Sequence, residues 1–127
     1  MERRKAIRAL VVEDDEAILE LVRKVLEREG FAVEGVKSGA AAIELLDIIP
    51  YDLLILDLMI PHVGGELVMQ FLAVAQPKML RRVIVTTASP RLLSCEFLRR
   101  ICKILEKPFD IADLALLARE CGEPAAA

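Results

Sequence analysis

The sequence lacks the features that mark several common protein classes. It has no tryptophan and a single histidine, and its three cysteines, Cys95, Cys102 and Cys121, include no C-x-x-C pair. A zinc site would therefore have few ligands, and we expect the cysteines to be reduced and mostly buried rather than joined in a disulfide. No run approaches the roughly 18 unbroken apolar residues of a membrane-spanning helix. No apolar signal segment follows the basic N-terminus, which favours a cytoplasmic location.

The charge and length of the chain limit which functions and how many domains it can have. The 17 basic and 20 acidic residues are mixed along the chain and give a net charge of −3. This balance offers no broad basic surface, so we expect neither direct nucleic-acid binding nor membrane binding. A chain of 127 residues is long enough to bury its own core. We therefore expect one domain over 1–127, with a core at about 7–121 and a tail at 122–127.

Two apolar periodicities alternate along the chain. Short apolar runs predict strands at 7–12, 32–36, 53–56, 83–87 and 101–105. Helical spacing of apolar residues predicts helices at 16–29, 38–49, 66–75, 92–100 and 111–121. Asp15 can cap the first helix, and Gly30 and Pro50 follow the ends of the first two. Five strand–helix units predict an α/β fold, a doubly wound parallel sheet with helices on both faces.

Polar residues gather where the predicted strands end. They are Glu13, Asp14 and Asp15 after the first strand, Asp57 after the third, Thr86 and Thr87 in the fourth, and Lys107 after the fifth. The carboxyl ends of parallel strands meet in one crevice. Clustered carboxylates repel one another unless a cation joins them, and oxygen ligands suit Mg²⁺, which also binds phosphate oxygens. A carboxylate beside Mg²⁺ can act as a nucleophile and form an acyl phosphate.

Four motifs in this order resemble a known family. They are the acidic run 11–16, the D-x-M-x-P motif at 57–61 with Gly65 after it, the Thr-Ala pair at 87–88, and Lys107-Pro108-Phe109. Together they resemble the CheY-like receiver domain of bacterial two-component response regulators, over nearly the whole chain. The resemblance implies a flavodoxin-like (βα)5 sheet of strand order 2-1-3-4-5. It also implies a cis peptide before Pro108.

The resemblance further implies a metal site. Asp14 would bind Mg²⁺ directly, Glu13 would do so mainly through water, and Asp57 and the backbone carbonyl of Met59 would complete the protein ligands. Three acids follow the first strand, so the match could slip by one residue. We prefer Glu13 and Asp14 as ligands, with Asp15 beginning the helix.

The resemblance also assigns the phosphoryl chemistry. Asp57 would accept a phosphoryl group from a histidine kinase or a phosphotransfer protein, Thr87 would hydrogen-bond a phosphoryl oxygen, and Lys107 would pair with another. The chain would then be a switch read by a downstream protein or output domain, not a metabolic enzyme. Bulk at Met59 is expected to slow self-dephosphorylation. His62 is expected to be a solvated loop residue, not a phosphoryl carrier.

The sequence departs from the family pattern near the fifth strand. Ile104 stands where the family usually has the aromatic residue of its output switch, and the spacing from Thr87 to Lys107 is short. We therefore expect an altered or shortened fourth helix and an unusual partner-facing surface. An exposed part of the last helix would be a docking surface or a possible homodimer contact.

Two other functions stay open. The chain could be an interaction module of the same fold that works without phosphorylation. It could also be a small phosphohydrolase or nucleotide-binding domain, although G-x-G-x-x-G and G-x-x-x-x-G-K-[ST] are absent and Met59 replaces a second acid. No output domain is visible, which fits either a stand-alone regulator or a receiver cut from a larger protein.

Overall fold

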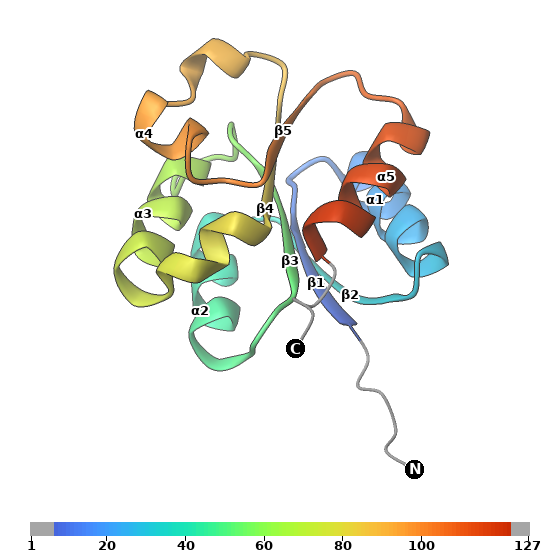
Figure 1. The fold of residues 1–127 in the computed structure, drawn as a ribbon, viewed down its shortest axis with the longest axis horizontal. Helices are drawn as coiled ribbons and strands as arrows, with labels where there is room; N and C mark the ends of the chain where they lie inside the picture. Colours follow the sequence, from blue (N-terminus) through green and yellow to red (C-terminus); the bar gives the residue numbers. More distant parts are fainter. Residues whose placement is uncertain (1–6, 123–127) are drawn as a thin grey trace.

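The centre of the protein is a five-stranded parallel sheet (Figure 1). The structure is a computed structural model that describes residues 7–122. The strands are β1 (Ile7–Val12), β2 (Phe31–Val36), β3 (Leu53–Asp57), β4 (Val83–Thr87) and β5 (Lys103–Glu106), in the order β2-β1-β3-β4-β5. Every residue of β3 and β4 is buried, as expected for strands covered on both faces. The predicted fold class and strand order are confirmed.

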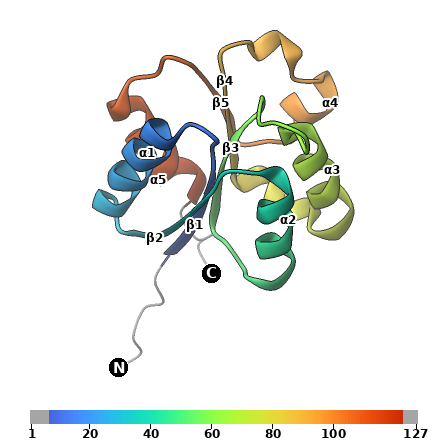
Figure 2. The same ribbon diagram turned by 180° about the vertical axis from the view of Figure 1, so that it is seen from behind.

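Helices cover both faces of this sheet, and the view from behind shows the same two layers (Figure 2). The helices are α1 (Glu16–Arg28), α2 (Gly39–Ile48), α3 (Gly65–Ala75), α4 (Cys95–Leu98) and α5 (Ile111–Gly122). One apolar core joins the sheet to α1 and α5, and the other joins it to α2, α3 and α4. No helix among residues 7–122 is long and apolar enough to cross a membrane.

Local chemistry sets where the first helices begin and end. Asp15 precedes α1, and its Oδ1 accepts a hydrogen bond from the Ile18 N–H at 3.0 Å, which confirms the predicted cap. Ser38 caps α2 in the same way through the Ala41 N–H. Gly30 follows α1 with φ at 95°, a backbone conformation that favours glycine. These caps fix the loops that leave β1 and β2.

The region between β4 and β5 differs most from the sequence prediction. In place of a helix over 92–100 there is a short 3₁₀ turn, η2 (Pro90–Leu92), and then the four-residue α4, which confirms a shortened fourth helix. β5 begins two residues later than predicted. A further 3₁₀ segment, η1 (Pro77–Arg82), was not predicted, and buried Met79 and Leu80 anchor it. Gly122, the first residue of the predicted tail, is the last residue of α5, and 123–127 lie outside the described residues.

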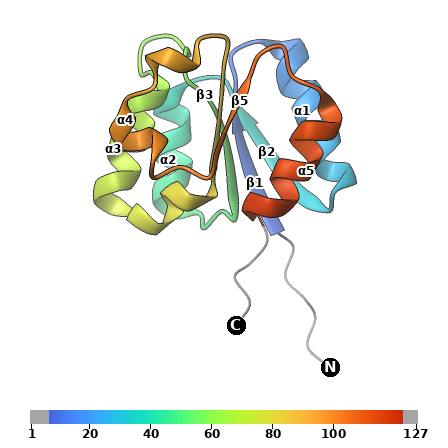
Figure 3. The same ribbon diagram turned by 45° about the horizontal axis from the view of Figure 1, so that its top comes forward.

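The expectation of reduced cysteines was wrong. Cys102 and Cys121 form a disulfide with an S–S distance of 2.04 Å and a Cα–Cα distance of 6.0 Å. The expectation that the cysteines are mostly buried was also wrong, because only Cys121 is buried, Cys102 is partly buried and Cys95 is exposed. The cause is topological. α5 runs back antiparallel to β5, so the end of the helix returns to the start of the strand (Figure 3). Two cysteines separated by 19 residues therefore meet.

The disulfide is expected to stabilise the fold, because it closes a loop of 19 residues in the unfolded chain. Replacing both cysteines, as Cys102→Ala with Cys121→Ala, should lower the free energy of unfolding by about 2–4 kcal/mol. Chemical denaturation with and without a thiol reductant measures the effect. The reductant should destabilise the wild type and the Cys95→Ala control but not the double variant. Equal stability of the wild type in both conditions would contradict the expectation.

Candidate functional site

Three carboxylates meet at the carboxyl edge of the sheet. Glu13 and Asp14 directly follow β1, and Asp57 is the last residue of β3, the neighbour of β1 in the sheet. One carboxylate oxygen from each lies within 4.8 Å of the others. Glu13 is 4% exposed and Asp57 5% exposed, whereas Asp14 is open to solvent. Two buried acids and one accessible acid therefore share one small site.

Lys107 crosses the end of β4 to reach two of these acids. Its Nζ donates to Oε1 of Glu13 at 2.8 Å and to Oδ2 of Asp57 at 3.2 Å. Its backbone N–H donates to the Thr87 carbonyl at 2.8 Å, and the peptide bond to Pro108 is cis, which confirms that prediction. One ammonium thus faces three carboxylates, which leaves the site negatively charged.

The ionisation of these groups follows from burial and pairing. Burial raises the pKa of Glu13 above its ordinary value, and the hydrogen bond from Lys107 opposes this only in part. Burial acts to lower the pKa of Lys107, but the bond to Glu13 and the charge of Asp57 raise it overall. Lys107 therefore stays protonated at neutral pH. Glu13 carries its negative charge at an energetic cost, which a cation in the site would relieve.

The loop after Asp57 holds the carboxylate in place. Oδ1 of Asp57 accepts the Met59 N–H at 3.1 Å, and the Leu58 N–H donates to the Thr86 carbonyl at 3.0 Å. The Gly65 N–H closes the loop on the Leu58 carbonyl at 3.1 Å. Met59 is 60% exposed beside the site. His62 is an exposed loop residue, as expected, with φ at 64°.

The remaining polar residues at the strand ends are Thr86, Thr87 and Asp15. Thr86 pairs with Asp57 in the register between β3 and β4, and Thr87 ends β4 fully buried. The Thr87 hydroxyl accepts the Ser89 N–H at 3.0 Å. The side chain of Asp15 caps α1, whereas the acids whose oxygens lie within 4.8 Å of one another are Glu13, Asp14 and Asp57. Which acids bind a metal stays a prediction. The sequence predicted that Lys107 and Glu13 lie in the same crevice, but not that Lys107 bonds Glu13 across a separation of 94 residues.

The donor set suits a hard cation. Carboxylate oxygens are the ligands that Mg²⁺ prefers, and it keeps waters in its remaining positions. Asp14 offers an accessible carboxylate beside the two buried ones. The excess of negative charge over the single Lys107 ammonium gives a divalent cation a favourable place to bind. The residues present therefore fit a magnesium ion.

Sequence comparisons with known proteins point to one family. The response regulator receiver domain family model matches residues 9–119. The transcriptional regulatory protein CutR of Streptomyces coelicolor is 34% identical over 120 residues, covering 91% of this chain and 54% of CutR. The response regulator receiver protein CpdR of Brucella abortus is 31% identical over 107 residues, covering 84% of this chain and 89% of CpdR.

A solved structure shows the same fold. The CheY-like response regulator receiver domain from Methylobacillus flagellatus superposes with a TM-score of 0.80 at 27% identity, covering 92% of this chain and 99% of that one. The chain belongs to the response regulator receiver domain family, whose members serve as signalling switches in two-component systems. It spans about half the length of CutR, the transcriptional regulator it matches.

Gly65 is expected to be essential to the shape of the site. A Cβ on Gly65 would lie 2.9 Å from the Asp57 carbonyl oxygen and 2.9 Å from the Leu58 Cα, both backbone atoms that cannot rotate away. Gly65→Ala should therefore lower the free energy of unfolding by about 1–3 kcal/mol. Chemical denaturation measures the loss.

Gly64→Ala is the matched control. A Cβ there would meet nothing closer than 3.9 Å, so only the weaker preference for glycine before α3 is lost. That loss should stay below about 1 kcal/mol. Equal losses for the two variants would show that the close approach at Gly65 does not matter.

Proposed function

We propose that Asp57 is the phosphoacceptor of this receiver domain and that its phosphorylation switches a partner-binding surface. The observation that carries the proposal is the setting of its carboxylate. Asp57 is buried, held by the Met59 N–H and by Lys107, and within 4.8 Å of the Glu13 and Asp14 oxygens. Such an acid is positioned as a nucleophile and surrounded by groups that can stabilise phosphoryl charge.

The proposed reaction is a phosphoryl transfer. A carboxylate oxygen of Asp57 attacks phosphorus on a phosphohistidine of a histidine kinase or phosphotransfer protein. The new O–P bond forms as the N–P bond breaks, and the electron pair stays on the histidine nitrogen, which takes a proton. Asp14, Asp57 and the Met59 carbonyl would hold Mg²⁺, with Glu13 acting mainly through water. The ion would neutralise charge on the transferring phosphoryl oxygens.

The hydrogen bonds of two side chains, Lys107 and Thr87, would change on phosphorylation. Lys107 now bonds Glu13 and Asp57, and it would turn to a phosphoryl oxygen. The Thr87 hydroxyl now accepts from Ser89, and it would donate to another phosphoryl oxygen. Ser89 precedes η2 and α4, so this rearrangement would move the segment between β4 and β5. A partner that prefers the moved form shifts the population toward it.

The output surface would differ from the family's usual one. Ile104 is half-buried and packs against the core beneath α2, α3 and α4. Its aliphatic side chain cannot act as an aromatic switch that changes rotamer. The short α4 supports the same conclusion, because it reduces the helical surface that a partner could contact. These two features also favour the second candidate, an interaction module that works without phosphorylation. Slow self-dephosphorylation, a cytoplasmic location and a homodimer all stay predictions.

Intact-mass measurement after incubation with acetyl phosphate and Mg²⁺ tests the phosphoacceptor. Wild type should gain one phosphate, about 80 Da, as an acyl phosphate. Asp57→Asn keeps the shape of the side chain and should gain none, and chelating the metal should abolish the gain in wild type. The same gain in Asp57→Asn would place the phosphate on another residue. The protein could also remain unphosphorylated even with a kinase as the donor. In that case, a partner that binds Asp57→Asn as well as it binds wild type would favour the interaction module.

A further inference from the structure

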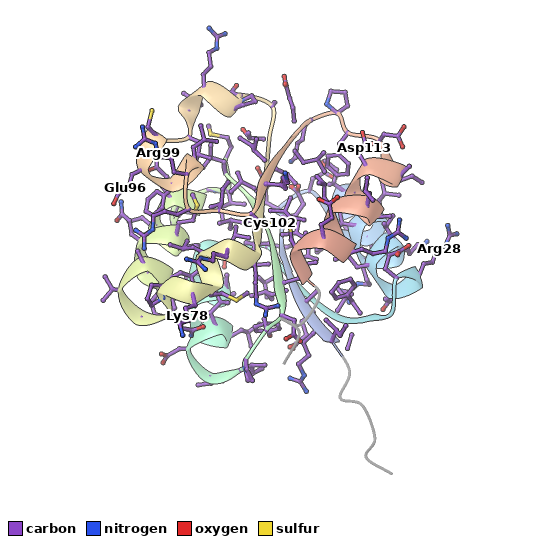
Figure 4. All side chains as sticks on the ribbon, in the orientation of Figure 1. Arg28, Lys78, Glu96, Arg99, Cys102 and Asp113 are labelled. Atoms are coloured by element: carbon purple, nitrogen blue, oxygen red, sulfur yellow. A yellow bond between two sulfur atoms is a disulfide. The ribbon has the colours of Figure 1, made fainter. Side chains whose placement is uncertain are left out.

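A basic cavity lies at the end of the sheet opposite Asp57. It occupies about 430 Å³ between η1, which leads into β4, and the segment that leads into β5. Its lining consists of Pro77, Lys78, Arg81, Arg99, Arg100, Ile101 and Cys102. Lys78, Arg99 and Cys102 are labelled in Figure 4. Lys78 and Arg99 lie on the side of the sheet that carries α3 and α4, whereas Cys102 packs against the core on the α5 side. The cavity shares no residue with the acidic site.

The charge of this cavity is all of one sign. Lys78, Arg81, Arg99 and Arg100 contribute four cations, and no acidic residue is part of the lining. Within residues 7–122, the one ion pair to any of the four joins Arg100 to Glu96, at 3.8 Å and largely exposed. Four cations gathered on a chain of net charge −3 repel one another, and an anion between them would relieve that repulsion.

We propose that the basic cavity binds a small ligand with two or more linked phosphate groups, such as a nucleoside triphosphate. Three of the four cations are arginines, whose planar guanidinium groups match phosphate oxygens with paired hydrogen bonds. A volume of about 430 Å³ falls in the range of small-molecule sites. Pro77, Ile101 and Cys102 add an apolar portion to the lining, which a base or sugar could contact.

The confinement of the charge favours a small ligand over a nucleic acid. A nucleic-acid strand is held by basic residues spread along its backbone, and this chain is acidic overall. The four cations come instead from two short segments, at 78–81 and 99–100, that line one cavity. A compact ligand with several charges close together suits a single cavity better than an extended strand does.

Calorimetric titration with inorganic triphosphate and with adenosine triphosphate tests the proposal. A chelator is present, so the acidic site around Asp57 carries no metal and repels both probes. Both should bind the wild-type protein. The double variant Arg81→Gln with Arg99→Gln should weaken binding at least about tenfold, since it removes two guanidinium partners. No heat from either probe, with a thermal-shift assay also unchanged, would overturn the proposal.

The matched control is Lys24→Gln with Arg28→Gln, two exposed cations of α1, which covers the face of the sheet opposite α3 and α4. Arg28 is labelled in Figure 4. At about 0.15 M salt, charges are screened over about 8 Å, so this control should retain wild-type affinity. An equal loss in both variants would show general electrostatic attraction only. Tighter binding of a hexaglutamate peptide or a DNA oligonucleotide would also overturn the assignment. Asp57 phosphorylation is measured separately, so either proposal can fail alone.

Discussion

The meeting of three carboxylates at one edge of the sheet is the constraint on which the rest of the structure depends. Like charges about 4 Å apart repel by roughly 4 kcal/mol near a protein surface. Lys107 bonds Glu13 and Asp57 and leaves Asp14 unmatched. The metal-free protein therefore holds more negative charge in this site than it can neutralise. We regard this imbalance as the source of the site's proposed affinity for a cation and then for a phosphoryl group.

The fold holds these charges together against their repulsion. β1 and β3 are adjacent central strands with cores on both faces, so the acids that follow them cannot move apart without disturbing buried side chains. The loop after Asp57 is held in place by backbone hydrogen bonds and by the close approach of Gly65. At the other end of the sheet, the disulfide ties α5 to the start of β5. The disulfide and the acidic site thus lie at opposite ends of the strands.

The sequence predicted what short-range chemistry controls. β1 and β4 have their predicted bounds, and Asp15 caps α1, because apolar runs and capping residues act locally. The disulfide was not predicted, since it joins residues that meet only because α5 packs back along β5. The crevice that brings Lys107 near Glu13 was predicted, but the bond between their side chains was not. η1 carries no helical periodicity, so it was not predicted. The basic cavity that η1 lines could not be predicted for the same reason.

The most direct test of this account is the effect of Mg²⁺ on thermal unfolding of wild type, Asp14→Asn and Asp57→Asn. A ligand that binds only the folded state raises stability as its concentration increases, by about 2.7 kcal/mol at a hundred times its Kd. The account predicts a clear rise in the unfolding temperature of wild type and a much smaller one in both variants, whose sites carry less negative charge. An equal rise in all three proteins, or none in wild type, would contradict it.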